Sequence, residues 1–302
     1  MTVLTSSIAL SLKETLDEII TDDPGGSKKR AMFLKWCTEK SMSDAYEDDV
    51  EYAGPGYASE VSEAAPIPLG SITEGAVTRY LARKFGLRLA ISEEAVEDGK
   101  YSSVIDAAKR LTYSLWDTAD LDATLMLVRA TTSGYTYGDG VVLASSSHTL
   151  AGGGTFSNTL ATPMSPSRAA MITVTSAIKT LPGHNGIRRG YSPKAIVCPV
   201  EQWATWKAIV GSEKAPEAGE FNQINVVHEM DLQVYPLPKW SNTTTNWGVL
   251  TDADNGFNFR WKRRPRSKTW VENSEEVMTH AISARWARGN SDPGRSFYFS
   301  NS

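Results

Sequence analysis

The sequence predicts an α+β protein, and three observations lead to that class. Residues 102–129 contain neither glycine nor proline and carry apolar side chains at helical spacing. Residues 166–250 alternate helix and strand patterns, which is typical of a compact α/β module. Residues 257–286 contain runs in which every second side chain is apolar, the period of a half-buried strand. We therefore expect one long helix, one α/β module and a separate group of strands.

Residues 1–51 have too little apolar surface to fold alone. Helical spacing between Ile8 and Ile20 predicts a short amphipathic helix, and a second short helix is expected from Lys28 to Thr38. Residues 43–49 are acidic and show no periodicity. We predict an N-terminal arm that docks on its own body or on a neighbouring subunit.

Residues 52–90 are predicted to form a long, mostly polar β-hairpin. Glycine and proline recur between Tyr52 and Gly75, which excludes a core segment, and the alternation from Phe85 to Ile91 marks a strand. Two arms joined near residues 66–75 would project from the body as an extended loop. Such a hairpin exposes its edges unless a partner covers them.

The helix of residues 102–129 is the strongest element in the sequence. Its apolar face is lined by Val104, Ala108, Leu111, Leu115 and Ala119. At ~1.5 Å per residue it would be about 40 Å long, more than a small compact domain requires. We interpret it as a strut, followed up to residue 165 by a connection rich in Gly, Ser and Thr.

The remaining residues divide into the α/β module and a β segment. In the module, helices are expected at 166–180 and 201–210, with strands at 195–200, 225–227 and 232–237. In the β segment, strands are expected at 257–262, 278–286 and 297–299. Because no other partner is evident, these last strands are expected to pack on the long helix.

Composition excludes several classes of protein. The 302 residues are 41% hydrophobic and 22% charged, enough to bury a core, and the net charge of -4 argues against a generic nucleic-acid coat. Two cysteines, Cys37 and Cys198, cannot build a disulfide framework. No apolar run approaches the ~18 residues of a membrane span, and no signal peptide is recognised. We expect a soluble protein of a reducing compartment.

No catalytic frame is recognised in the sequence. His148, His184, His228 and His280 fall in no metal-binding or catalytic pattern, and phosphate loops and nucleophile elbows are missing. Residues 252–256 resemble the start of a calcium loop without its closing glutamate, so a turn is predicted there. We therefore expect no enzyme activity, no cofactor and no metal.

Two charge patterns carry hypotheses. A basic cluster, Lys262, Arg263, Arg264, Arg266 and Lys268, is explained by a solvated hairpin end, by a salt link to an acidic surface of another subunit, or by a contact with nucleic acid. The candidate acidic partners are Glu47, Asp48, Asp49, Glu60 and Glu63. Separately, Glu93 and Glu97 could share a helix face as the carboxylate pair of a hydrolase, although such pairs are usually solvated.

The order of these elements resembles the major capsid proteins of tailed bacteriophages with the Hong Kong 97-type fold, and most closely the Mu-type head subunits. The likeness covers residues 52–302. It is carried by Glu63-Ala64-Ala65-Pro66-Ile67-Pro68, by Phe85-Gly86 leading to Ile91-Ser92-Glu93-Glu94-Ala95 and Glu97-Asp98, by Ser146-Ser147-His148, by Gly154-Thr155-Phe156-Ser157-Asn158, and by the strand from Ser192-Pro193 to Cys198-Pro199.

The resemblance implies a structural role and a division of the chain. It implies an N-terminal arm (1–51), an extended loop (52–90) lying across a neighbouring subunit, a peripheral domain with a spine helix and connection (91–165), an axial domain (166–250) and a peripheral β segment (251–302). The inter-subunit contacts expected on this basis are Glu60, Glu63, Pro66, Pro68, Arg79, Arg263, Arg264 and Arg266.

The resemblance also implies partners. The subunit would assemble with itself into hexamers and pentamers of an icosahedral shell that confines double-stranded DNA, without contact to a membrane. Portal and scaffolding proteins are expected, and a decoration protein is a further candidate partner. The protein would belong to the virion and assemble in the host cytoplasm. We expect no covalent cross-link, because Lys84 is the one lysine of the loop region and nothing pairs it with an asparagine. An encapsulin-type container of the same fold is the alternative.

Overall fold

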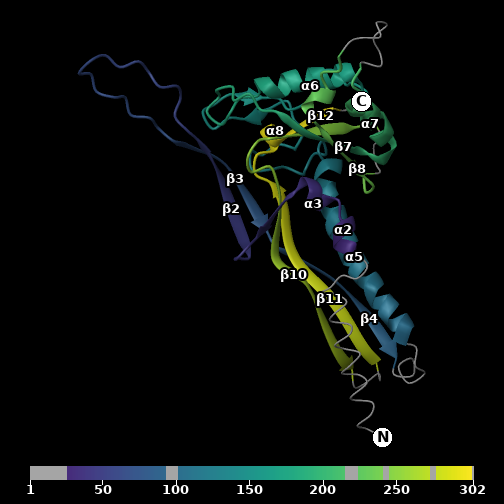
Figure 1. The fold of residues 1–302 in the computed structure, drawn as a ribbon. Coiled ribbons are helices and arrows are strands. Elements are labelled where there is room, and N and C mark those ends of the chain that lie inside the picture. Colours follow the sequence, from purple (N-terminus) through teal and green to yellow (C-terminus); the bar gives the residue numbers. More distant parts are fainter. Residues whose placement is uncertain (1–25, 93–100, 215–223, 241–244, 273–276, 301–302) are drawn as a thin grey trace.

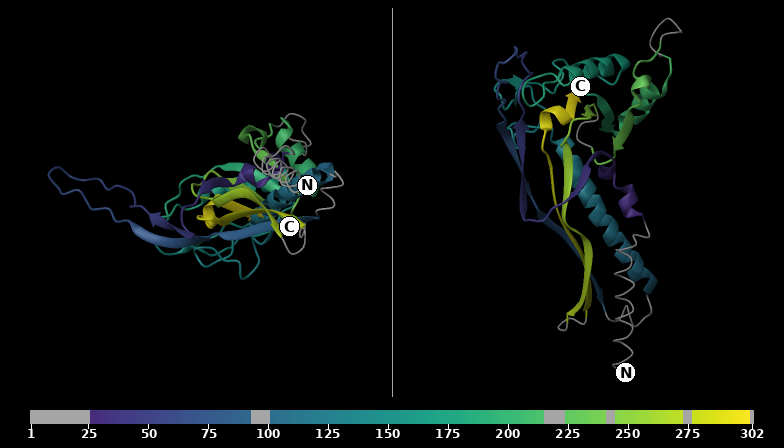
Figure 2. Two further views of the ribbon diagram at one scale, coloured as in Figure 1. Left: turned by 90° about the horizontal axis from the view of Figure 1, so that it is seen from below. Right: turned by 60° about the vertical axis from the view of Figure 1, so that its left-hand side comes forward.

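The chain forms an elongated body from which one long loop projects (Figure 1). The computed structural model describes residues 26–92, 101–214, 224–240, 245–272 and 277–300. A long helix and three long strands form the lower part of the body, and a smaller group of helices and strands lies above them (Figures 1 and 2). The predicted combination of one long helix, an α/β module and separate strands is confirmed.

The lower part is built on a four-stranded sheet in the order β1-β10-β11-β4, which we call the spine sheet. Its strands are β1 (Thr38–Ser41), β4 (Arg83–Ser92), β10 (Phe257–Glu272) and β11 (Val277–Asn290). The last three are antiparallel neighbours, and β1 runs parallel to β10. The predicted packing of the β segment on the long helix is confirmed, and the sheet also includes β1 and β4 from earlier in the chain.

The predicted long helix is confirmed as α5 (Tyr101–Val128), which packs on β11 and β4. Val104, Ala108, Leu115 and Ala119 of the predicted face are buried. Beyond them the buried stripe continues through Ala123, Met126 and Leu127. The same rows of side chains that define the helix in sequence therefore attach it to the spine sheet.

Aromatic side chains fill the space between α5 and the spine sheet. Trp286 of β11 is fully buried, stacks on Phe85 at a centroid distance of 4.1 Å and lies 5.6 Å from Trp261. Its indole Nε1 donates to Asp122 of α5 at 3.0 Å. Aromatic rings bury much apolar area, and the hydrogen bond satisfies the one polar atom of this side chain.

The upper part contains a second four-stranded sheet in the order β12-β9-β7-β8. Its strands are β7 (Pro193–Pro199), β8 (Gln233–Leu237), β9 (Trp247–Thr251) and β12 (Phe297–Ser300). The helices α6 (Arg168–Thr180) and α7 (Trp203–Gly211) pack on it, and the short helices η1 (Val200–Gln202), η2 (His228–Met230) and α8 (Pro293–Ser296) connect its elements. The pair β5 (His148–Thr149) and β6 (Thr155–Phe156) forms a small separate ladder.

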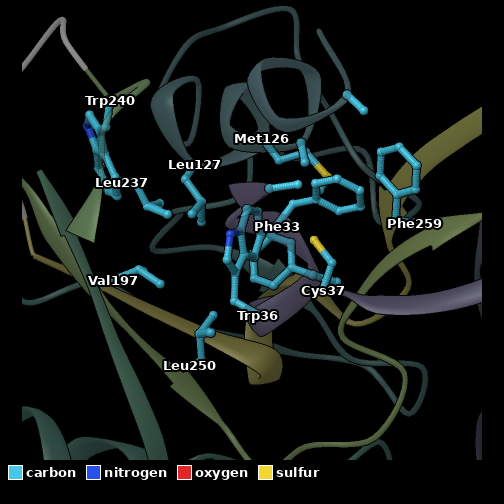
Figure 3. Packing of buried hydrophobic residues seen from close by; sticks show 14 of the residues in the cluster. Phe33, Trp36, Cys37, Met126, Leu127, Val197, Leu237, Trp240, Leu250 and Phe259 are labelled. Atoms are coloured by element: carbon cyan, nitrogen blue, oxygen red, sulfur yellow. The ribbon is translucent and has the colours of Figure 1, made fainter. Parts of the chain in front are cut away.

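One hydrophobic core joins the two parts. Figure 3 shows Phe33 and Trp36 packed against Met126 and Leu127 of α5, with Leu250 of the upper sheet nearby. Because both sheets contribute to this cluster, the lower and upper parts share one core instead of meeting at a polar linker.

The N-terminal segment differs from its prediction. The second helix, expected from Lys28 to Thr38, is two single turns, α2 (Ser27–Arg30) and α3 (Phe33–Trp36), because Ala31 has extended backbone torsions. The chain then adds β1 to the spine sheet, so this part of the arm docks on its own body. The helix predicted between Ile8 and Ile20 lies outside the described residues.

The extended loop is present, but its two strands match the predicted arms only in part. Its strands are β2 (Tyr46–Ala53) and β3 (Thr73–Leu81), which pair antiparallel, and residues 54–72 join them. The acidic stretch 43–49, expected to be irregular, supplies the start of β2. The strand predicted at Phe85–Ile91 exists as part of β4, but it pairs with β11 in the spine sheet. Apolar side chains of β4 are needed against α5, which removes that strand from the projecting loop.

One predicted strand is wrong, and another is confirmed with an unexpected partner. Residues 225–227 form a turn, because the Asn225 side chain donates to the carbonyl oxygens of Ile209 and Ser212 at 2.7 and 2.8 Å. The strand at Phe297–Phe299 exists as β12, but it pairs with β9 of the upper sheet rather than with the strands that precede it in the chain. Strand β9 itself was not predicted.

We expect the substitution Trp286→Ala to destabilise the fold by about 4 kcal/mol, because it leaves a large cavity between α5 and the spine sheet. Trp286→Phe should cost less, since a ring remains to stack on Phe85. Urea unfolding of the unassembled chain measures both. An unchanged midpoint for Trp286→Ala would contradict this account of the core.

Candidate functional site

The tip of the extended loop, residues 54–72, exposes large apolar side chains. Leu69 is 99% exposed, Ile67 85%, Tyr57 82% and Ile72 70%. The tip carries two glutamates, Glu60 and Glu63, and no basic residue. An exposed apolar segment of this kind is costly for a protein that stays alone in water, and it typically marks a contact with another protein.

The root of the loop is attached to the body by alternating acids of β2. Glu47, Asp49 and Glu51 lie two residues apart, so their side chains share one face of the strand. Glu47 accepts from Arg260 Nη1 at 2.9 Å, and Asp49 accepts from Nη2 of the same guanidinium. The Arg260 side chain is 6% exposed and therefore holds both carboxylates against the body.

The third acid, Glu51, belongs to a buried cluster of charges. Its Oε1 lies 3.1 Å from Arg295 Nη1 and 2.5 Å from His184 Nδ1. Arg295 also bonds Asp292 at 3.0 Å. Burial alone would raise the pKa of Glu51, but the hydrogen bond from His184 and the charge of Arg295 outweigh burial and lower the pKa. Burial raises the pKa of Asp292, against the effect of Arg295.

An aromatic contact completes the root. Tyr80 of β3 is buried, and its ring lies 3.8 Å from the guanidinium of Arg260. Its hydroxyl bonds the Ser291 hydroxyl at 2.6 Å. A Cβ at position 289 would lie 2.9 Å from the Tyr80 ring, so Gly289 permits this close approach.

A second feature is a basic groove on the face of the spine sheet that points away from α5. Its basic residues come from two strands, Lys84 and Arg88 of β4 and Arg263, Arg266 and Lys268 of β10. The groove has a volume of about 830 Å³, and its described lining contains no carboxylate. Partial burial, together with the neighbouring charges of Arg266 and Arg285, lowers the pKa of Arg263.

The structure separates the predicted contact residues into two regions. Glu60, Glu63, Pro66 and Pro68 are exposed on the loop tip. Arg79 lies on the loop strand β3, where it forms an ion pair with Asp48 at 2.6 Å that lowers the pKa of that carboxyl.

The three predicted arginines of β10 do not share one environment. Arg263 donates to the Ser283 hydroxyl at 2.8 Å and, with Arg266, lines the basic groove. Arg264 pairs with Glu39 of β1 at 2.7 Å. The cluster lies within β10, where the ladder register shifts, so the hairpin-end interpretation is wrong.

Three of the five acids that were candidate partners of the basic cluster form ion pairs within the chain. Arg260 engages Glu47 and Asp49, and Arg79 engages Asp48, all within the chain. Glu60 and Glu63 remain as exposed acids on the tip.

The histidines have structural surroundings. His148 is buried and bonds Asp139 at 2.5 Å, and His280 bonds the Thr269 hydroxyl at 2.8 Å. Across the residues that the structure describes, no three His, Cys, Asp or Glu side chains are grouped as metal ligands would be. The carboxylate pair Glu93 and Glu97 lies outside the described residues. Among the described helices, none is both long and apolar enough to cross a membrane.

Sequence reasoning missed the residues that hold the loop root, namely the buried Arg260 and Arg295 and the half-buried His184. The period-two spacing of Glu47, Asp49 and Glu51 was a usable signal for a strand with one charged face. Their basic partners lie more than 130 positions away in the chain, and no local pattern connects them.

We expect Glu51→Gln to lower the stability of the unassembled chain by about 2 kcal/mol at neutral pH, because Arg295 then keeps only one carboxylate partner in a buried site. The native pKa of Glu51 is lowered, so its contribution is present above the unfolded-state pKa and is lost as pH falls through the native pKa. Urea unfolding from pH 7 down to pH 3 should show the two proteins converging in acid. A constant difference at all pH values would contradict the ion-pair account.

The chain is similar to known proteins both in its sequence pattern and in its fold. A family described as phage capsid protein matches residues 75–293, well over half of the chain. No curated protein matches it. Among solved structures, a chain of Microbacterium phage Oxtober96 has a TM-score of 0.56 at 10% identity, covering 89% of this chain and 90% of that one.

Further solved structures have the same fold. A chain of Mycobacterium phage Adephagia has a TM-score of 0.56 at 11% identity, covering 90% and 89% of the two chains. The capsid of an empty GTA particle has a TM-score of 0.54 at 14% identity, covering 89% and 88%. The fold is thus shared over nearly the whole length of each chain. The chain therefore belongs to the phage capsid protein family, as a structural major capsid protein with the Hong Kong 97-type fold.

Proposed function

We propose that this major capsid protein assembles with itself, as hexamers and pentamers, into the icosahedral shell that encloses the double-stranded DNA of a tailed bacteriophage. The observation that carries the proposal is the loop tip, which exposes Ile67, Leu69 and Ile72 on a rigidly attached hairpin. Burying these side chains against another subunit would remove their apolar surface from water, at roughly 25 cal/mol per Å². The family match supports the same conclusion.

The parts of the chain take their roles from this proposal. The spine sheet with α5 would form the peripheral domain, and the upper sheet with α6 and α7 the axial domain at the five- and six-fold centres. The tip residues Glu60, Glu63, Pro66 and Pro68, together with the arginines at 79, 263, 264 and 266, would contribute to contacts between subunits.

Other partners and the setting follow from the same role. We infer that portal and scaffolding proteins take part in assembly, that the shell forms in the host cytoplasm and belongs to the virion, and that the DNA is held chiefly by confinement. A decoration protein is a further candidate partner. The subunit is proposed to work without enzymatic activity or a cofactor. A special closeness to Mu-type head subunits stays a prediction.

An encapsulin-type container remains the second candidate. A virus-like particle from Pyrococcus furiosus has a TM-score of 0.53 at 10% identity, covering 95% of this chain and 98% of that one. The likeness reports the fold alone, whereas the family match points to phage capsids. The phage shell is therefore the function that we favour.

We expect replacement of residues 57–69 by two glycines to abolish assembly while leaving the melting temperature unchanged. The removed segment lies beyond the ladder of β2 and β3 and contributes nothing to the buried core. Light scattering and sedimentation would measure assembly, and circular dichroism would measure folding. Loss of folding would place the tip in the core, and normal shells without the tip would contradict its role.

A further inference from the structure

A cavity separate from the basic groove lies at the root of the extended loop, where β3 meets the body. We call it the root pocket. It has a volume of about 270 Å³ and is walled by β3, α5, β11 and the segment 135–138. Arg79 comes from β3, Arg288 from β11, and Arg129 follows the last residue of α5. Three arginines that are far apart in the sequence therefore border one small space.

The charges around the root pocket do not balance. Its described lining contains these three arginines and no carboxylate. Two of the arginines have a carboxylate partner outside the lining, since Arg79 pairs with Asp48 at 2.6 Å and Arg288 Nε lies 2.8 Å from Asp122. Asp122 also lies 3.6 Å from Arg83, so two guanidinium groups share its charge. Positive charge therefore exceeds negative charge at this place.

Arg129 is the arginine of the root pocket that has no carboxylate partner among the described residues. Its guanidinium lies over the ring of Tyr135, at 4.3 Å from the centroid. Asp139, which follows the segment 135–138, is engaged by His148 at 2.5 Å. The carbonyl end of α5 favours a cation at this position, but its partial charge is smaller than that of a carboxylate. A full negative charge is thus missing beside Arg129.

The walls of the root pocket are closely packed, and its border is exposed. A Cβ at Gly138 would lie 2.5 Å from the Thr78 hydroxyl, so the segment 135–138 fits tightly against β3. Thr78 and Met126 are buried lining residues, whereas the Arg79 side chain is 63% exposed and Tyr135 is 46% exposed. A ligand can therefore enter from solvent beside Arg79 and Tyr135 and reach hydroxyl as well as guanidinium donors.

We propose that the root pocket binds a small phosphate-type oxyanion between Arg79, Arg129 and Arg288. Free phosphate and the phosphate group of a small monoester share the required chemistry, because their oxygens accept several guanidinium N–H groups at once. The bound anion joins β3 of the loop to α5 and to β11. It adds a ligand-dependent attachment to the permanent ion pairs that Arg260 and Arg295 form with the loop root.

The test is equilibrium dialysis of the full chain against radiolabelled inorganic phosphate at constant ionic strength. The first variant is Arg129→Gln, which removes the cation without a carboxylate partner. The second is Arg79→Gln, which changes the opposite wall at an exposed side chain. The matched control is Arg110→Gln, which removes one positive charge from an exposed position of α5 outside the root pocket. Circular dichroism checks that all three variants are folded.

We expect saturable binding of one phosphate per chain in the wild type and in Arg110→Gln. Binding should weaken about tenfold or more in Arg129→Gln and in Arg79→Gln, because each loses charged hydrogen bonds to the anion. Phosphate should also raise the melting temperature of the wild type more than that of Arg129→Gln, since a ligand stabilises the state that binds it. Absence of saturable binding, or equal affinity in Arg129→Gln and Arg110→Gln, would overturn the proposal.

Competition against the labelled phosphate identifies the source of the anion. Glycerol 3-phosphate that competes more strongly than unlabelled phosphate would assign the root pocket to monoesters, and weaker competition would assign it to free phosphate. Both results support the proposal. A short DNA duplex should not compete, because a double helix is too large to enter a cavity of about 270 Å³. Displacement by the duplex at lower phosphate concentration than by either small anion would assign the arginines to nucleic acid and overturn the proposal.

Discussion

Two buried guanidinium groups, those of Arg260 and Arg295, fix the direction in which the extended loop leaves the body. Each is at least 94% buried and bonds carboxylates from the same face of β2. Removing charges from water is costly, and the cost is offset only when each charge finds well-placed partners. The loop root therefore has a single orientation in which Glu47, Asp49 and Glu51 are all paired, and a shift of one residue would point these acids to the opposite side of the strand.

This constraint explains how one chain combines a fixed root with an exposed tip. The root is bonded to the body by ion pairs and by the buried Tyr80, whereas residues 54–72 extend beyond the ladder. A rigid root delivers the tip to a defined place at a low cost in conformational entropy, which is how preorganisation strengthens binding. Helix α5 and the core that both sheets share make the body rigid enough to hold the loop in this direction.

Local patterns predicted those parts of the fold that depend on local periodicity. The helix α5 and most strands of the upper sheet were recognised because their burial follows sequence spacing. Pairing was less predictable, since β4 and β12 have strand patterns but choose partners through contacts distant in the chain. The strand predicted at residues 225–227 failed for another reason. The Asn225 side chain donates hydrogen bonds to the backbone carbonyl oxygens of Ile209 and Ser212, and these bonds hold the segment in a turn.

The candidate site divides in the same way. Exposed acids and prolines on the tip, and the basic run of β10, were visible in the sequence because their chemistry is local. The pairing of Asp48 with Arg79 and of Arg264 with Glu39 was not, because each joins segments that only the fold brings together. Three of the five candidate acids, Glu47, Asp48 and Asp49, are engaged within the chain, whereas Glu60 and Glu63 are exposed on the loop tip.

The central claim is that this chain builds a shell from copies of itself. Negative-stain electron microscopy of the purified protein, alone and together with a scaffolding protein encoded beside it, tests that claim most directly. The account predicts closed shells, tubes or hexameric rings in at least one of the two samples. Small dispersed particles in both samples would contradict it.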